Sequence, residues 1–371
     1  MQKFYGVSDN QGHDSAIPLS KGSIEKKKIG ILTWYFGTNY GAKAQAFALQ
    51  SVLNKLEFST KVIRFLPEDY QKINILASVT SKKNLLNIKN TTALIRRNNK
   101  FRNFDKRFSL TAQTKSDSDI DNLHLDTVVL GSDAIFNVKH PLFNPIYYGV
   151  GLHTPKISYA ASCEYLEPDY QLSDDIKSSI REMRAVSVRD VNTQELIRNN
   201  TGITPVITLD PTFLYNFHEF NKPVSNKPYI LVYTFSEWNQ ISSKVKRYAR
   251  SHDLEIISVG CKCSWSDKSY ESADEETWIS SFRDAELVIT DSFHGTVFSI
   301  KNKKQILLLG RPDKSAKINS LLQGFGISRE YYQTGEDVEK YLEDTIDYDV
   351  VGKIVDQKVA ESIKFLKDNI G

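Results

Sequence analysis

The chain has 371 residues, of which 40% are hydrophobic, so it is long enough to fill the cores of two domains. Its formal net charge is +3 with 25% charged residues, a balance that does not indicate a nucleic-acid-binding protein. No apolar run approaches the roughly 20 residues that cross a bilayer, and the first residues lack the pattern of a secretory signal. Three cysteines form no disulfide framework, which favours a reducing, cytoplasmic compartment.

Apolar strand patterns alternate with helical patterns along most of the chain. Strands are expected at 28–34, 61–65, 125–130, 156–161, 185–188, 205–209, 229–235, 255–259, 287–290 and 305–309. Helices are expected at 44–52, 81–108, 193–198, 242–251, 275–284, 295–301, 318–325 and 355–369. This alternation predicts an α/β protein with two Rossmann-like domains that face each other across a cleft.

The composition of the connecting segments predicts where these domains begin and end. We expect a mobile arm at 1–27, a first domain at 28–212, a linker at 213–227, a second domain at 228–345 and a final helix at 346–371 that packs back on the first domain.

Polar side chains follow several predicted strands of the first domain. Asn39 and Gly41 lie in the loop after the first strand, and Asp133, Arg189 and Asp210 follow later strands. Because the carboxyl ends of parallel strands meet at one sheet edge, these residues are expected to border a ligand cleft. Each could instead cap a helix, and for Asp210, which precedes a proline, a capping or turn role is preferred.

A histidine stands in the same position in the second domain. The run at 287–290 predicts a buried strand, and His294, Gly295 and Thr296 open the following helix. The free N–H groups at such a helix start favour an anion. The alternative is a surface histidine on a tight turn.

Two further features have ordinary structural explanations. The basic, amphipathic segment 81–108 is interpreted as a solvated helix face, with contact to an anionic lipid head group or a pyrophosphate-linked acceptor as the alternative. Cys261 and Cys263 lack a matching Cys/His pair, so we predict no metal site.

Six segments in order carry a resemblance that no single motif would. They read WYFGTNYGAKAQAFAL at 34–49, GSDAIFN at 131–137, SYAAS at 158–162, SVRD at 187–190, LDPT at 209–212 and VITDSFHGTVFSI at 288–300. Together they resemble the polysaccharide pyruvyl transferase family, over roughly residues 28–327. The resemblance implies a fold like that of the two-domain GT-B glycosyltransferases. It also implies that phosphoenolpyruvate, a co-substrate, donates its pyruvyl group to two sugar hydroxyls to form a cyclic ketal, with no cofactor.

The resemblance assigns roles to the residues named above. His294 is the matching histidine and would act as general acid on the donor, since imidazole titrates near neutrality. Arg189 would bind the donor's anionic groups, and Asp133 would accept a proton from, or orient, the acceptor hydroxyls. The first domain would hold the acceptor and part of the donor site, and the second domain the rest of the donor site. The expected substrate-binding residues are Asn39, Tyr40, Gly41, Lys43, Ser292, Gly295 and Thr296.

The sequence departs from the family pattern beside the histidine. Some members carry an arginine two residues before it, where this chain has Ser292. A serine brings no charge to a donor phosphate, so another cation is expected to substitute. The candidates are Lys43, Arg311, Lys314 and Lys317.

Two other functions fit the same pattern. One is a glycosyltransferase with a nucleotide-sugar donor, which would need a carboxylate for the ribose, such as Glu271, Glu275 or Glu276. The other is a non-catalytic glycan-binding relative. The leading hypothesis implies a glycan partner from a surface polysaccharide or its lipid-linked precursor, and therefore an enzyme at the inner face of the membrane where the acceptor is lipid-linked.

Overall fold

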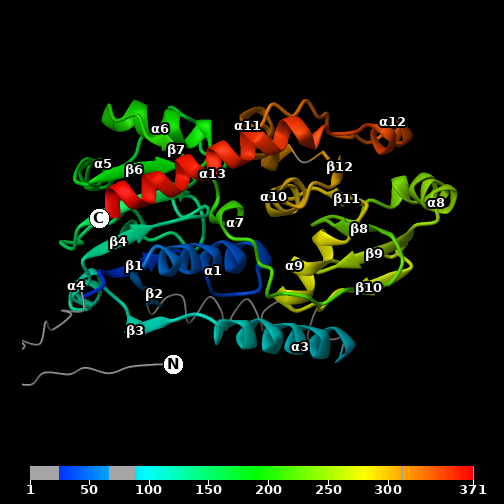
Figure 1. Cartoon of the computed structure of the whole chain (residues 1–371). Coiled ribbons are helices and arrows are strands. Elements are labelled where there is room, and N and C mark those ends of the chain that lie inside the picture. Colours follow the sequence, from blue (N-terminus) through cyan, green and yellow to red (C-terminus); the bar gives the residue numbers. More distant parts are fainter. Residues whose placement is uncertain (1–24, 67–87, 311, 371) are drawn as a thin grey trace, which may run out of the picture.

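The computed structural model describes residues 25–66, 88–310 and 312–370, with the backbone alone described for 88–96 and 312–315. Most of the predicted arm at 1–27, and Arg311, lie outside the described residues. The described chain forms two α/β halves, each built on a parallel sheet (Figure 1).

The first sheet has seven described strands in the order β3-β2-β1-β4-β5-β6-β7. All its pairs are parallel. The strands are β1 (Lys28–Leu32), β2 (Ser59–Phe65), β3 (Leu110–Thr114), β4 (Thr127–Leu130), β5 (Lys156–Ala161), β6 (Ala185–Val188) and β7 (Val206–Ile207). The strand order reverses between β1 and β4, and ligands bind at such switch points in open α/β sheets.

The second sheet has five described strands in the order β10-β9-β8-β11-β12, again all parallel. The strands are β8 (Tyr229–Tyr233), β9 (Glu255–Val259), β10 (Lys268–Tyr270), β11 (Leu287–Thr290) and β12 (Gln305–Leu308). Here the order reverses between β8 and β11, so the loops after these two strands lie at the second switch point.

Helices connect the strands and cover the sheets. They are α1 (Tyr40–Lys55), α3 (Ile88–Asp105), α4 (Asp117–Asp121), α5 (Asp174–Arg181), α6 (Val191–Thr201), α7 (Pro211–Leu214), α8 (Ser242–Ser251), α9 (Glu275–Arg283), α10 (Phe293–Lys301), α11 (Pro312–Gly324), α12 (Val338–Glu343) and α13 (Tyr348–Ile370). Within β4, Val129 faces one apolar cluster while Val128 and Leu130 face another, as expected for a strand buried on both sides. The predicted α/β class with two Rossmann-like halves is confirmed.

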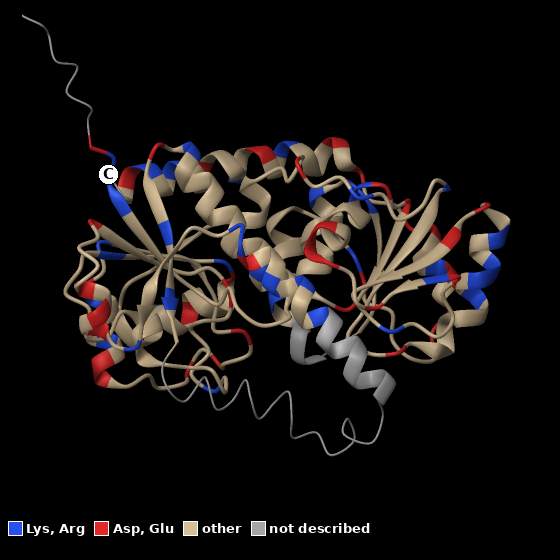
Figure 2. Cartoon of the chain, turned by 90° about the horizontal axis from the view of Figure 1, so that it is seen from below, with Lys and Arg blue, Asp and Glu red and all other residues tan. Residues whose placement is uncertain are grey.

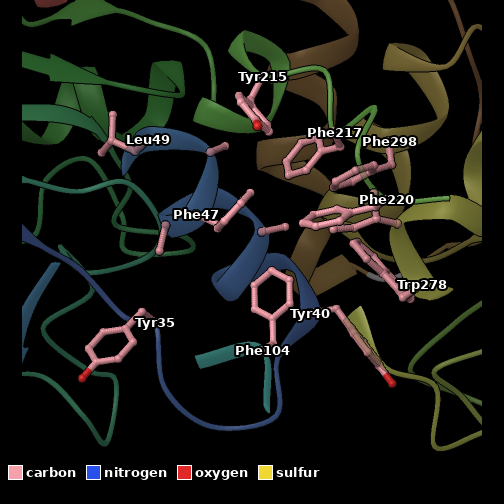
Figure 3. Packing of buried hydrophobic residues seen from close by; sticks show 14 of the residues in the cluster. Tyr35, Tyr40, Phe47, Leu49, Phe104, Tyr215, Phe217, Phe220, Trp278 and Phe298 are labelled. Carbon is pink, nitrogen blue, oxygen red and sulfur yellow. The ribbon is translucent and has the colours of Figure 1, made fainter. Parts of the chain in front are cut away.

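An aromatic cluster joins the two halves (Figure 3). Tyr40 of α1 stacks on Trp278 of α9 with ring centroids 5.3 Å apart and an interplanar angle of 9°. Phe217 and Phe220, from the segment predicted as a linker, are buried in the same cluster. Part of the predicted linker is therefore core, and its first residues lie in α7. Burial of aromatic rings of this size contributes about 1.5–3 kcal/mol each to stability.

The last helix returns to the first half of the molecule. Figure 1 shows α13, in red, extending across the molecule to the side of the first sheet. Ser362 accepts a hydrogen bond at its Oγ from the backbone N–H of Leu209 (3.0 Å), and Phe365 packs 6.2 Å from the Tyr159 ring of β5.

The basic helix α3 uses several of its cations within the molecule. Lys100 donates to the carbonyl of Ser272 (2.6 Å), and Arg107, just beyond the helix, forms an ion pair with Glu276. Figure 2 shows basic and acidic segments interspersed over both halves. These pairs tie α3 to the second half of the chain, which is a structural use of part of the predicted basic face.

Glu275 at the start of α9 is 1% exposed, and neither carboxylate oxygen has a hydrogen-bond partner within the described residues. Burial raises its pKa from 4.5 to about 7. Because the folded state binds this proton more tightly than the unfolded state does, the contribution of Glu275 to stability is complete below pH 4.5 and is lost as the pH rises through 7. Glu275→Gln is expected to remove this loss and to stabilise the protein at pH 8 by about 1–3 kcal/mol, measured by urea unfolding.

The exposed Glu271 supplies the control for this prediction. Glu271→Gln should leave the dependence of unfolding free energy on pH unchanged. An identical pH dependence in wild type and the Glu275 variant would contradict the prediction.

Candidate active site

Loops from both switch points enclose a small cavity of about 90 Å³. It is lined by Asn39, Asp133, Glu164, Arg189, Tyr233, Phe235, Ser292, Phe293, His294 and Lys317. Tyr233 is the last residue of β8, and Lys317 comes from α11. The other lining residues follow β1, β4, β5 and β6 of the first sheet and β8 and β11 of the second. The predicted convergence of strand ends thus brings Asn39, Asp133, Arg189, Ser292 and His294 together.

His294 lies in the first turn of α10 with its side chain 11% exposed. Its Nε2 is buried without a hydrogen-bond partner among the described residues and lies 3.6 Å from Oδ2 of Asp210. On another side of the ring is the backbone of Gly41, where an added Cβ would stand 2.0 Å from Nδ1. Gly41 is therefore required because α1 and the imidazole approach so closely.

Asp210 connects the histidine to a buried arginine. Its Oδ2 accepts a hydrogen bond from Arg189 (3.1 Å), and its Oδ1 accepts bonds from the N–H and hydroxyl of Thr212. Burial alone would raise the pKa of Asp210, but its interactions with His294 and Arg189 outweigh burial and hold that pKa well below its usual range. Asp210 is therefore held as an anion beside the imidazole of His294.

Arg189 has a side chain only 1% exposed and also pairs with Asp133 at 3.5 Å. Burial lowers the pKa of Arg189, but the charges of Asp133 and Asp210 more than compensate and raise it. The guanidinium lies 4.3 Å from the ring centroid of Phe293. Phe293 thus holds the arginine at the cavity wall through a cation–π contact.

Lys317 is a second cation at this cavity. Its Nζ forms an ion pair with Glu164 at 2.7 Å and lies 5.8 Å from the Phe293 ring. Of the two suggested substitutes for the arginine missing at Ser292 whose side chains are described, Lys317 lines the cavity and Lys43 does not. The side chain of Lys314 is outside the described residues.

The N-termini of two helices also meet at the cavity. Asn39 caps α1 by accepting at Oδ1 from Ala42 N–H (3.2 Å), and Ser292 caps α10 by accepting at Oγ from Gly295 N–H (2.9 Å). Both caps line the cavity. The positive ends of the two helix dipoles therefore reinforce Arg189 and Lys317 toward an anion.

Five predicted substrate-binding residues do not line this cavity: the two glycines, Gly41 and Gly295, and three residues with larger side chains, Tyr40, Lys43 and Thr296. Tyr40 is 1% exposed and donates its hydroxyl to the carbonyl of Ala273 (2.8 Å). Lys43 is fully buried, where it pairs with Asp105 and donates to the carbonyl of Phe101. Thr296 is buried with its hydroxyl donating to the Ser292 carbonyl (3.0 Å). Packing has turned these three side chains inward, so the structure places them away from the cavity wall.

Gly295 has a steric role. An added Cβ would stand 2.1 Å from Oγ1 of Thr290, so the glycine lets the first turn of α10 close over β11.

Sequence reasoning undervalued Asp210 and overlooked Glu164 and Phe293. Asp210 does cap α7, as preferred, but it also contacts both His294 and Arg189. The sequence did carry a signal for Asp210, because this residue follows the strand predicted at 205–209 and lies in the LDPT segment. Nothing local marks Glu164, whose partner Lys317 is 153 residues away.

Gly41→Ala provides a test of the close packing around His294. The new methyl group would displace the imidazole, so we expect at least about a 100-fold lower turnover, because small misplacements of a catalytic group are costly. Alanine suits a helix better than glycine does, so the melting temperature should change little. Initial-rate assays and a thermal melt of the same sample check this expectation.

Gly352 in α13 is the matched control, since an added Cβ there meets no atom within 4 Å. Gly352→Ala should keep full turnover. A Gly41 variant with wild-type turnover would contradict the packing argument.

Solved structures with a similar fold are two-half α/β proteins that cover nearly the whole chain. A UDP-GlcNAc 2-epimerase from Neisseria meningitidis, bound to UDP-GlcNAc, superposes with a TM-score of 0.54 at 7% identity, covering 93% of this chain and 99% of its own. A putative UDP-N-acetylglucosamine 2-epimerase from Listeria monocytogenes has a TM-score of 0.50 at 11% identity, covering 90% and 91%. The glycosyltransferase SnogD from Streptomyces nogalater has a TM-score of 0.45 at 12% identity, covering 93% and 99%. The fold is of the GT-B type.

Sequence comparison places the chain more narrowly. The model of the polysaccharide pyruvyl transferase family matches residues 39–313, and the chain belongs to this family. It is therefore a transferase, and a glycan acceptor is implied. No curated protein matches the sequence. In the part of the chain that the structure describes, no helix has both the length and the apolar character to cross a membrane.

Proposed function

We propose that this protein transfers the pyruvyl group of phosphoenolpyruvate to two hydroxyls of a glycan and releases phosphate, leaving a cyclic ketal. The observation that carries the proposal is the position of His294. Its imidazole is clamped between Gly41 and Asp210 in a cavity that also holds two cations and two helix N-termini.

The donor carries a phosphate and a carboxylate, and the cavity offers groups of the matching kind. Arg189 presents a guanidinium suited to an oxyanion, and Lys317 presents an ammonium. Both are paired with carboxylates in the described structure, Arg189 with Asp133 and Lys317 with Glu164. The helix N-termini capped by Asn39 and Ser292 add favourable potential without a paired carboxylate.

The first step needs a proton on the methylene carbon of the donor. An imidazolium at His294 gives this proton to C3, and positive charge develops at C2, where the first acceptor hydroxyl adds. Asp133 takes the proton of that hydroxyl. Asp210, whose Oδ2 lies 3.6 Å from the buried Nε2, orients the ring for this transfer.

The second step breaks the bond between C2 and the phosphate oxygen. The second hydroxyl adds to C2 and closes the ketal. Of the two hydroxyl protons, one restores the proton that His294 gave to C3 and the other leaves with the phosphate. Atoms therefore balance without a redox partner.

The alternative function, transfer from a nucleotide-sugar donor, would need a carboxylate to bind the ribose, and the three candidate glutamates do not supply one at the cavity. Glu275 is buried in the core side of α9, and Glu276 pairs with Arg107 and Lys222. Glu271, Glu275 and Glu276 all lie outside the lining of the cavity at His294. None of the three is therefore placed to bind a ribose in that cavity.

A thermal-shift comparison tests the proposal. Phosphoenolpyruvate should raise the melting temperature with a dependence on concentration that follows occupancy, whereas pyruvate alone should not. UDP- and GDP-sugars form the second arm and simple saccharides the third. Stabilisation by sugar nucleotides alone would support a glycosyltransferase, and stabilisation by saccharides alone would support a glycan-binding protein. Either result would contradict the proposal.

A further inference from the structure

A second cavity of about 380 Å³ adjoins the one at His294. The two share Asn39, Tyr233 and Phe235 in their walls, so they are contiguous. The larger cavity lies between the loop after β1 and the loops after β8 and β9. The mechanism above assigns no role to it, yet its size suits one or two sugar rings.

Phe235 separates the two cavities and has an unusual environment for a phenylalanine. It is 61% exposed, although most aromatic residues of this half are buried. Its position is fixed, because its backbone N–H donates to the buried carboxylate of Asp291 (2.8 Å) and its ring packs 5.9 Å from that of Tyr233. An exposed, held aromatic face suits the C–H face of a sugar ring, which is apolar and weakly positive.

Arg97 supplies charge on the other side of the same cavity. Its guanidinium donates to the carbonyl of Thr38 (3.2 Å) and lies 5.4 Å from the Tyr40 ring centroid. Among the described residues no carboxylate pairs with it. The other two charged residues of the wall, Lys262 and Glu237, pair with each other at 3.1 Å. Arg97 is therefore the cation of this wall that an anionic ligand would neutralise.

We propose that this cavity binds the acceptor as an anionic saccharide, with a sugar ring against Phe235 and a phosphate or carboxylate substituent on Arg97. A ring on Phe235 stands at the boundary of the two cavities. Hydroxyls on its far edge therefore reach toward His294 and Asp133. The inference that this saccharide is the acceptor rests on the proposed function, but the binding test below does not depend on turnover.

Saturation-transfer NMR with simple probes tests the inference on the full chain. The neutral probes are methyl glucoside and methyl galactoside. The anionic probes are glucose 1-phosphate, galactose 1-phosphate and the methyl glycosides of glucuronic and galacturonic acid. Phosphoenolpyruvate is present with each probe to occupy the His294 cavity. We expect an anionic probe to receive saturation at its ring protons and to bind about tenfold more tightly than its neutral counterpart. Phosphates and uronates form separate arms of the experiment, so the result distinguishes binding of a phosphate group from binding of a carboxylate group.

Variants separate the two contacts. Phe235→Ala should weaken the binding of neutral and anionic probes alike by about fivefold. Phe235→Tyr keeps an aromatic ring and should bind both kinds of probe as wild type does. Arg97→Gln should abolish the preference for anionic probes and leave the neutral ones unchanged. Val350→Ala, which removes apolar surface from an exposed position on α13, is the control and should bind as wild type.

Two results would overturn the inference. One is binding of the anionic probes by the Phe235 and Arg97 variants as tightly as by wild type. The other is the absence of saturation of every probe. Failure of the proposed function has a different signature, because it appears as the lack of a thermal response to phosphoenolpyruvate.

Discussion

Replacing His294 with alanine is expected to reduce pyruvyl transfer by about 100- to 10,000-fold while the protein stays folded. The imidazole is the proton donor in the proposed first step, and no other histidine lines its cavity within the described residues. Nε2 makes no hydrogen bond, and Arg189 and Thr212 still bind Asp210 when the imidazole is removed, so the fold is expected to persist. Phosphate release and near-UV circular dichroism, measured on the same preparation, check both halves of this expectation.

A histidine elsewhere on the surface serves as the control. His252 follows α8 and is exposed, so His252→Ala should keep wild-type turnover. Transfer activity retained in the His294 variant would exclude the proposed role of the imidazole.

Replacing Arg189 with alanine is expected to destabilise the protein by about 3–5 kcal/mol at pH 7, because it leaves two buried carboxylates without their cation. These are Asp133 and Asp210, at 3.5 and 3.1 Å from the guanidinium. Asp210 has a pKa held below its usual 3.8, so its stabilising effect is complete above about pH 4 and is lost as the pH falls further. Urea unfolding at pH 7 and at lower pH measures both effects.

Two companion variants make the Arg189 result interpretable. Arg198 on α6 has a 50% exposed side chain and a 3.8 Å pair with Glu195, so Arg198→Ala should cost less than about 1 kcal/mol. Arg189→Lys keeps the charge but not the fork geometry, and should fold while binding phosphoenolpyruvate more weakly. An alanine variant as stable as wild type would contradict the buried network.

Much of the fold and part of the site could be predicted from sequence because the signals are local. A buried parallel strand is a short apolar run, and its carboxyl end determines where the next polar residue lies. Asn39, Asp133, Arg189 and His294 were predicted to meet for this reason, and the structure brings them together. The edge strands β3 and β10 were missed since their sequences, LTAQT and KSY, carry little apolar pattern.

The errors at the site arise from contacts between distant parts of the chain. Lys43 follows a loop that faces the cleft, but Asp105, 62 residues away, holds its ammonium in the core. Tyr40 likewise packs on Trp278 of the other half. No local pattern determines which way the first turn of α1 presents these side chains, because that depends on α3 and α9.

The aromatic cluster shared by the two halves has a consequence for how the enzyme opens. GT-B folds are often pictured as two lobes on a hinge, but rotation here would separate Tyr40 from Trp278 and Phe217 from Phe298. Exposing several such rings costs several kcal/mol, far more than thermal energy. Opening by rotation of the lobes is therefore unfavourable, and the two lobes are expected to melt as one cooperative unit in calorimetry.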